Sequence, residues 1–114
     1  MPDLINQSND PLYRLLREGS VKEFNVRKEA GEKCNLANCD LRDADLRGLN
    51  AKGLDFSGCY FRQSDLRGID FRDSNLEGAS INAAKVSGAY FPQELTAEEI
   101  ALSLQHGTRM RHKK

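Results

Sequence analysis

Residues 34–93 read CNLAN CDLRD ADLRG LNAKG LDFSG CYFRQ SDLRG IDFRD SNLEG ASINA AKVSG AYFPQ, a run with a period of five. The third position of each unit is large and apolar in eleven of the twelve units, Ala51 being the exception. The first position is mostly small, as in Cys39, Ala44 and Ser64. A period of five matches neither a helix nor a plain strand. It is typical of a chain that coils into stacked repeats.

These units predict an all-β solenoid in which each unit forms one side of a square coil. Twenty residues then complete a turn, neighbouring turns stack about 4.8 Å apart, and the run gives about three turns. First and third positions point inward, so residues twenty apart become neighbours in one column. The predicted core consists of Leu36, Leu41, Leu46, Phe56, Phe61, Leu66, Phe71, Leu76, Ile81, Val86 and Phe91.

Short helices are predicted before the coil. Asp10 followed by Pro11 is a typical helix start, and Gly19 ends that helix. Ser20 and Glu23 have the spacing of a capping box, which predicts a second helix up to Gly31. The alternative is that residues 24–28 form a degenerate first repeat, because Val26 keeps the register of the later units.

A third helix is predicted after the coil. Thr96 and Glu99 form a second capping-box pair, Ile100 and Leu104 give one apolar stripe, and Gly107 ends the helix. We therefore divide the chain into a polar segment with capping helices at 1–33, the coil at 34–93, and a helix with a basic tail at 94–114. Residues 1–9 are expected to be loosely held. Because open coil ends need covers, the helices are candidate caps, or one of them pairs with a second chain in a homodimer.

The bulk composition excludes several classes of protein. The chain of 114 residues carries 17 cationic and 17 acidic side chains, so no strong net charge directs it to one type of partner. Three cysteines without a CxxC pair are unlike a secreted disulfide scaffold. Neither a membrane span nor a signal peptide is evident in the sequence, which predicts a cytoplasmic location.

The repeats resemble the pentapeptide repeat family, whose pattern is A(D/N)LXX. The units ADLRG at 44–48, SDLRG at 64–68 and SNLEG at 74–78 carry the resemblance. It implies a right-handed, four-sided parallel β-helix, and residues 19–31 resemble the helix that precedes the repeats in small bacterial members. Some family members modulate DNA gyrase or topoisomerase by imitating duplex DNA. Those relatives are longer, acidic and dimeric, whereas this chain is short and neutral.

Charged residues fill the outward positions. Asp at second positions alternates with Arg or Lys at fourth positions, an arrangement typical of a solvated surface. The side built from 34–38, 54–58 and 74–78 has Asp55 and Glu77 but no cation. The candidate partner-binding residues are Arg42, Arg47, Arg62, Arg67, Arg72, Arg109 and Arg111. The last two belong to the basic tail, which is a candidate contact for nucleic acid or an acidic protein.

The sequence indicates no redox or metal-binding role for the cysteines and histidines. Cys39 and Cys59 are twenty residues apart and stack in one column, where each replaces alanine as a small buried group. Parallel side chains on stacked turns point the same way, which is poor disulfide geometry. His106 and His112 have no neighbouring ligands at metal spacing, and we expect both to be solvated.

The sequence predicts no enzyme and no cofactor, because none of the common catalytic or phosphate-binding motifs occurs. The favoured function is a non-catalytic structural or protein-interaction module with an unidentified protein partner and no small-molecule substrate. The alternatives are a modulator of gyrase or topoisomerase, which the neutral charge disfavours, and a nucleic-acid contact through the tail.

Overall fold

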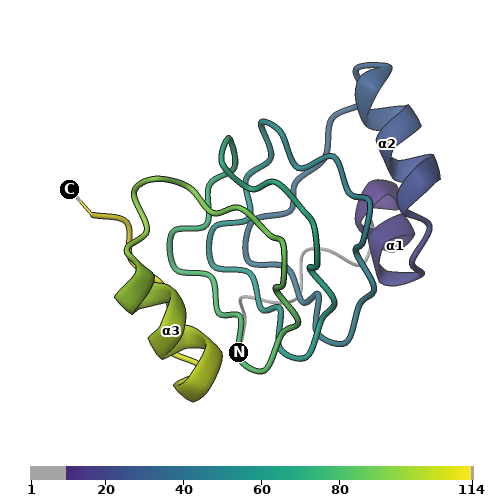
Figure 1. Cartoon of the computed structure of the whole chain (residues 1–114). Coiled ribbons are helices and arrows are strands. Elements are labelled where there is room, and N and C mark those ends of the chain that lie inside the picture. The colour runs from purple at the N-terminus through teal and green to yellow at the C-terminus, as the bar shows by residue number, and fades with distance from the viewer. Residues whose placement is uncertain (1–9, 114) are drawn as a thin grey trace.

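The computed structural model describes residues 10–113, so the segment 1–9 lies outside the described residues. Its helices are α1 (Pro11–Arg17), α2 (Val21–Glu29) and α3 (Ala97–His106). Between α2 and α3 the chain winds in repeated turns, with α1 and α2 at one end and α3 at the other (Figure 1). The helices therefore lie at the two ends of the coil, where the sequence predicted caps.

The helix predictions are confirmed, with one correction at α2. Asp10 caps α1 by accepting hydrogen bonds from the backbone N–H groups of Leu12 and Tyr13, at 2.9 and 3.3 Å. Residues 24–28 lie within α2, so the alternative of a degenerate repeat is wrong. Ser20, however, makes no side-chain capping bond, and the predicted capping box does not form. The buried side chains of Val21 and Phe24 anchor α2 instead.

Successive turns of the coil lie side by side with a register of twenty residues. Parallel bridges join Asp40 to Tyr60, Asp45 to Asp65, Asp55 to Asn75, Tyr60 to Ser80, Asp65 to Lys85 and Asp70 to Tyr90. In each pair the residue of the later turn uses both its N–H and its C=O to hydrogen-bond to the earlier turn. Tyr60 N donates to Cys39 O at 2.9 Å, and Tyr60 O accepts from Leu41 N at 2.8 Å.

The prediction of an all-β chain is met only in part. Among the described residues the bridges are isolated and no extended strand forms, while three helices do. The reason is the short repeat. Because the chain turns after every five residues, only one residue of each unit forms a bridge with the next turn, and a bridge at a neighbouring residue, which a strand would require, does not form. The parallel bridges are therefore confined to the second position of the units. Further backbone hydrogen bonds join the turns at the fifth position, as from Gly68 N to Ser87 O at 3.0 Å.

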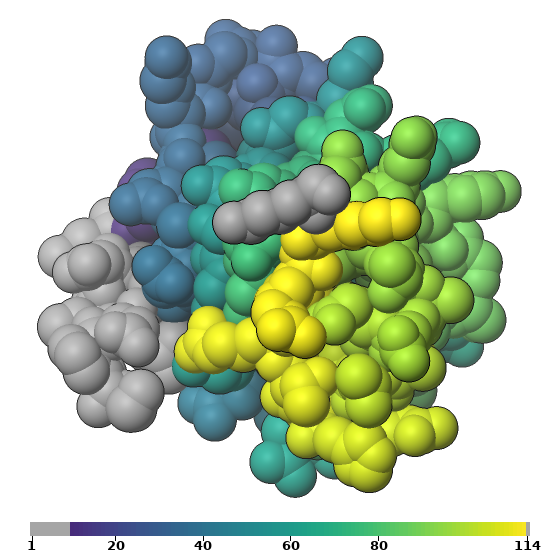
Figure 2. Space-filling view, turned by 90° about the vertical axis from the view of Figure 1, so that its left-hand side faces the viewer, coloured from purple at the N-terminus to yellow at the C-terminus, as the bar shows by residue number. Residues whose placement is uncertain are grey.

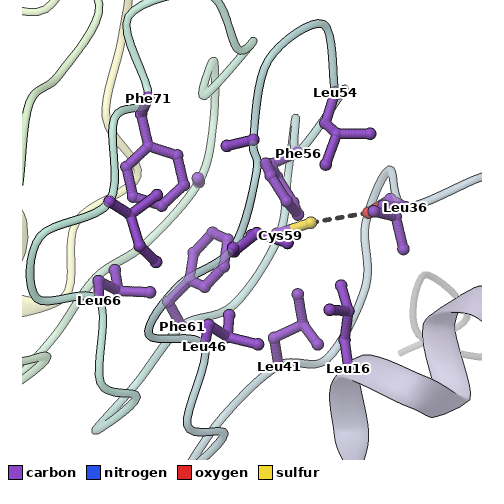
Figure 3. Close-up of a cluster of buried hydrophobic side chains, with 14 of the residues drawn as sticks. Leu16, Leu36, Leu41, Leu46, Leu54, Phe56, Cys59, Phe61, Leu66 and Phe71 are labelled. Carbon is purple, nitrogen blue, oxygen red and sulfur yellow. Dashed lines mark hydrogen bonds between the residues drawn. The ribbon is translucent and has the colours of Figure 1, made fainter. Parts of the chain in front are cut away.

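The interior is filled by first- and third-position side chains. Nine of the eleven predicted core residues are buried, whereas Val86 and Phe91 in the last turn are only half-buried. Phe56, Phe61 and Phe71 meet edge to face, with ring centroids 5.5 to 6.3 Å apart (Figure 3). Phe91 stacks on Phe71 at 6.0 Å. The predicted core is therefore closed to solvent as far as Ile81 and is partly exposed only on the last two sides of the coil.

Polar groups of α1 and α2 replace the hydrogen-bond partners that a preceding turn would supply. The Asp10 carboxylate accepts from Asn35 N at 2.8 Å, and Arg17 donates to Arg42 O at 2.7 Å. The Asn25 side chain accepts from Asn50 N and donates to Gly48 O, at 2.9 Å in both cases. These bonds satisfy backbone groups that would otherwise lack partners at this end of the coil.

The fifth position of most units adopts a left-handed backbone, which explains why glycine is common there. Gly58 has φ +69°, and an added Cβ would collide with the Asn38 side chain of the preceding turn. Gly68 has φ +76° but open space around it. We expect Gly68→Ala to cost about 1 kcal/mol of unfolding free energy from backbone strain alone. Gly58→Ala should cost more, by up to about 1 kcal/mol, because the end of the Asn38 side chain must also move. Urea unfolding of both variants measures the difference, and equal losses would contradict the close approach of the two turns.

Candidate interaction surfaces

The outer surface of the coil carries four Asp–Arg units of one design. In each, the Asp at the second position accepts hydrogen bonds from the backbone N–H and the guanidinium of the Arg two residues later. The guanidinium–carboxylate distances are 2.7 Å for Asp40–Arg42, 2.8 Å for Asp45–Arg47, 2.6 Å for Asp65–Arg67 and 2.8 Å for Asp70–Arg72. Each arginine is thus neutralised by its own unit, and the coil sides present fixed, paired charges.

These arginines hold the pKa of their aspartates below the ordinary value. Hydrogen bonds from the Arg72 side chain and backbone lower the pKa of Asp70 to about 2. The Arg67 side chain is the main cause of the lowered pKa of Asp65, and Arg47 of the preceding turn adds to it from 3.3 Å. Asp65 is therefore the most strongly held of these carboxylates, with contacts to two turns.

Lowering the pH should weaken the coil through these aspartates. Their pKa values are lower in the folded chain than the value of about 3.9 in an unfolded one, so their contribution is present above about pH 4. That contribution is lost as the pH falls from about 4 through 2. We expect the urea midpoint to fall over this range and Asp65→Asn to flatten the fall. Asp55→Asn is the control, because Asp55 has no cationic partner among residues 10–113. Identical pH profiles for both variants would contradict a role for the pairs.

The seven predicted partner-binding arginines do not form one patch. Arg42 and Arg62 lie on one side of the coil, Arg47 and Arg67 on the next, and Arg72 on the one after that, as their spacing by twenty requires. Arg62 is exposed and has no ion-pair partner within the described part of the chain. The structure therefore offers several small charged surfaces instead of a single basic one.

The basic tail, predicted as a candidate contact for nucleic acid or an acidic protein, is held against the coil. Arg109 lies 4.8 Å above the Tyr60 ring, hydrogen-bonds to the Tyr60 hydroxyl and donates to Gly78 O at 3.1 Å. Arg111 pairs with Glu99 of α3 at 3.3 Å. Met110, which the sequence did not single out, is fully buried between them. Both tail arginines thus have partners within the chain, and the tail contributes to closing the coil end.

The cysteines lie in an environment that suppresses reactivity. Cys39 and Cys59 are free thiols and fully buried. The Cys59 thiol donates to Leu36 O at 2.8 Å (Figure 3). Two causes raise the pKa of the Cys39 thiol far above its usual range. The larger is the hydrogen bond with Cys59, and the second is burial. Because the thiolate is the reactive form, this environment supports their interpretation as small packing groups.

The expectation of a solvated His112 is wrong. Its side chain is only 22% exposed, and its backbone N–H donates to Glu77 at 2.7 Å. Ring Nε2 is buried and has no hydrogen-bond partner in the part of the chain that the structure describes. The tail brings His112 back over the coil, a contact that no local sequence pattern predicts. His106, at the end of α3, is exposed as predicted. No cluster of His, Cys, Asp or Glu suited to a metal occurs in residues 10–113.

An open hollow of about 660 Å³ lies on the cation-free side of the coil, next to His112. The carboxylates that line it are Asp55, Asp73, Glu77 and Glu94. Arg72 reaches its rim, but its charge is already paired with Asp70. This acidic side differs from the others, where Asp40, Asp45, Asp65 and Asp70 are each paired with an arginine.

These features define a repeat protein. Its five-residue units stack in register, its interior is apolar, and Asp and Arg of the same unit pair on its outer surface. The chain belongs to the pentapeptide repeat family: the family model for pentapeptide repeats matches residues 32–63 and 55–91, with eight copies. The comparisons with curated proteins and with solved structures gave no match. Among the described helices, none has the length and apolar character needed to cross a membrane.

Proposed function

We propose that this chain is a non-catalytic structural and protein-interaction module. The observation that carries the proposal is that aspartates and arginines on the outer surface of the coil are paired with each other within single units. Asp40, Asp45, Asp65 and Asp70 each hold their own arginine, so the sides are rigid and pre-arranged. A rigid surface loses little conformational freedom on binding, which favours recognition of another macromolecule. The buried thiols and the side-chain-filled interior support a role without catalysis.

The finer architecture belongs to the same proposal. We take the coil to be the right-handed, four-sided parallel β-helix of the family, located in the cytoplasm of a bacterium. The parallel register of twenty residues supports four sides of five residues each. The end helices serve as caps within one chain, because α1, α2 and α3 all bond to the coil.

Affinity capture of the tagged full chain from its host tests the proposal. We expect a specific protein to be retained, and retention to change when one coil side is altered and not another. Arg62→Ala removes an exposed cation from one side, and Asp55→Asn removes a carboxylate from the acidic side; neither group has an ion-pair partner within residues 10–113. Retention of no specific protein would count against an interaction module.

The same capture separates the alternative functions. Enrichment of gyrase or topoisomerase subunits would favour modulation of those enzymes. Their DNA-like recognition requires columns of carboxylates, and here Arg47 and Arg67 interrupt the column of Asp45 and Asp65. Nucleic acid without protein would favour binding through cations, although Arg109 and Arg111 already have partners within the chain.

A further inference from the structure

One end of the coil is only partly covered. On the side formed by residues 79–83, Ala79 O accepts from Met110 N at 2.8 Å, Ile81 N donates to the Ser103 hydroxyl at 2.9 Å, and Ala83 N donates to Leu104 O at 3.1 Å. Every backbone group that would bond to a further turn on this side is thus satisfied by α3 or the C-terminal segment. Figure 2 looks onto this end, where the yellow C-terminal segment crosses beside the green surface of the last turn.

The next two sides of the same turn have no such cover. In the middle turn, Ser64 O accepts from Lys85 N at 2.9 Å, Leu66 N donates to Lys85 O at 2.8 Å, and Gly68 N donates to Ser87 O at 3.0 Å. The atoms twenty residues later are Ala84 O, Val86 N and Gly88 N. They have no hydrogen-bond partner among the described residues, and neither do Ala89 O and Phe91 N. These five groups form an open backbone edge.

The side chains along this open edge are also those of an interface. Val86 and Phe91 are half-buried, while the buried Leu46 and Leu66 precede Val86 in its column. Tyr90 is 56% exposed, and Lys85 is the single charged residue of 84–93. The two earlier turns carry Asp–Arg pairs on the 84–88 side, and the last turn does not. Loss of charge together with exposed aromatic and apolar groups is typical of the centre of a protein interface.

We propose that residues 84–91 form a docking edge for an extended segment of a partner protein, which pairs with the free backbone groups and packs one large apolar side chain on Val86. The neighbouring side shows the kind of occupant this end accepts: an extended stretch of main chain with one buried apolar residue, Met110. The docking edge is continuous with that covered side. The proposal rests on the proposed function as an interaction module and specifies its site.

The geometry of the inner turns defines the partner segment. Lys85 uses its N–H and C=O on Ser64 O and Leu66 N, and Ser87 O accepts from Gly68 N. A partner segment therefore needs three consecutive extended residues. The first must offer its N–H and C=O, the third must offer its C=O, and the side chain of the middle residue faces the apolar interior of the coil. A second copy of this chain fits the docking edge less well. Because α3 lies beyond the last turn, it prevents the ends of two coils from making direct backbone contact (Figure 1).

A peptide titration on the full chain tests the docking edge. The probe is an acetylated and amidated peptide with the sequence of residues 62–70, which contains the SDLRG unit of the middle turn. Added to ¹⁵N-labelled protein, it should shift the amide signals of Val86 and Gly88 and slow their hydrogen exchange. A peptide with aspartate in place of its central leucine should bind at least roughly tenfold more weakly, because a charge would face the apolar end.

A variant of the edge completes the test. Val86→Pro removes one free N–H donor without breaking any hydrogen bond that Val86 N makes in the described chain, and should also weaken binding roughly tenfold. The peptide comparison stands even where this variant folds poorly. No shift at about 1 mM peptide, equal binding of both peptides, or shifts centred on the acidic hollow would each overturn the proposal. A concentration-dependent doubling of mass that protects Val86 and Gly88 would assign the edge to a second copy and overturn it as well.

The two proposals can fail separately. When a partner captured by the wild-type chain is retained equally by Val86→Pro, the interaction module stands and the docking edge is wrong. When no protein is retained by the wild-type chain but the peptide binds the edge, the edge stands as a binding surface and the module is wrong.

Discussion

Phe61→Ala is expected to lower the free energy of unfolding by about 3–5 kcal/mol, close to the whole stability of a small domain. Phe61 is fully buried in the middle turn. Its ring meets Phe56 at 5.5 Å and Phe71 at 6.3 Å, both edge to face. Turns above and below prevent the backbone from closing on the space, so the substitution leaves a cavity and removes two aromatic contacts. Urea unfolding followed by circular dichroism measures the loss.

The matched control is the adjacent residue on the same side of the coil. Arg62 is exposed and its side chain has no ion pair in the described chain. Arg62→Ala should therefore change the free energy of unfolding by less than about 0.5 kcal/mol. Similar losses for the two variants would show that the inward and outward positions of the repeat are wrongly assigned.

The five-residue period made the coil predictable because it reports packing directly. A side chain at the third position has one environment in every turn, so Leu41, Phe61 and Ile81 are buried in the same column. Local helix signals were equally informative where the capping group is a neighbour in sequence. Asp10 caps α1, and Thr96 caps α3 by accepting from Glu99 N at 3.1 Å.

Contacts that close the coil ends were not predictable from the sequence. Ser20 has the spacing of a capping residue, yet α2 is placed by burial of Phe24 and by Asn25, whose side chain bonds to the coil. Met110 lies among cations and carries no local pattern, but it is buried because the tail folds back. These contacts join residues more than twenty positions apart, and no period relates them.

The outer charges illustrate a second limit. Alternating Asp and Arg predicted a solvated surface, but not that the arginine of each Asp-x-Arg unit would fold back on the aspartate two residues earlier. That geometry arises because second and fourth positions of one unit point the same way. It removes most of the predicted arginine surface from competition for partners. The acidic hollow and the docking edge, where Lys85 is the single charged residue, are then the surfaces left for a partner.

Ser103→Ala is expected to open the C-terminal end of the coil and to lower the free energy of unfolding by about 2–4 kcal/mol. The Ser103 hydroxyl accepts from Ile81 N at 2.9 Å and donates to Thr108 O at 2.7 Å, and it is fully buried. It thus takes the place of the backbone carbonyl that a fourth turn would offer to Ile81. Alanine leaves a buried N–H and a carbonyl unsatisfied, and no other described side chain is in place to bond them.

The expected consequence is local as well as global, since Ser103 links α3, the last turn and the C-terminal segment. Amide exchange should accelerate first at Ile81, Ala83 and Met110, whose N–H groups bond across this junction. Ser87→Ala is the control, because Ser87 is exposed in the same turn and its hydroxyl makes no bond in the described chain. Faster exchange confined to the N-terminal turn, or equal effects of the two variants, would show that a single hydroxyl does not hold the cap. A stable Ser103→Ala variant would mean that burial of Met110 and the α3 stripe closes the end without it.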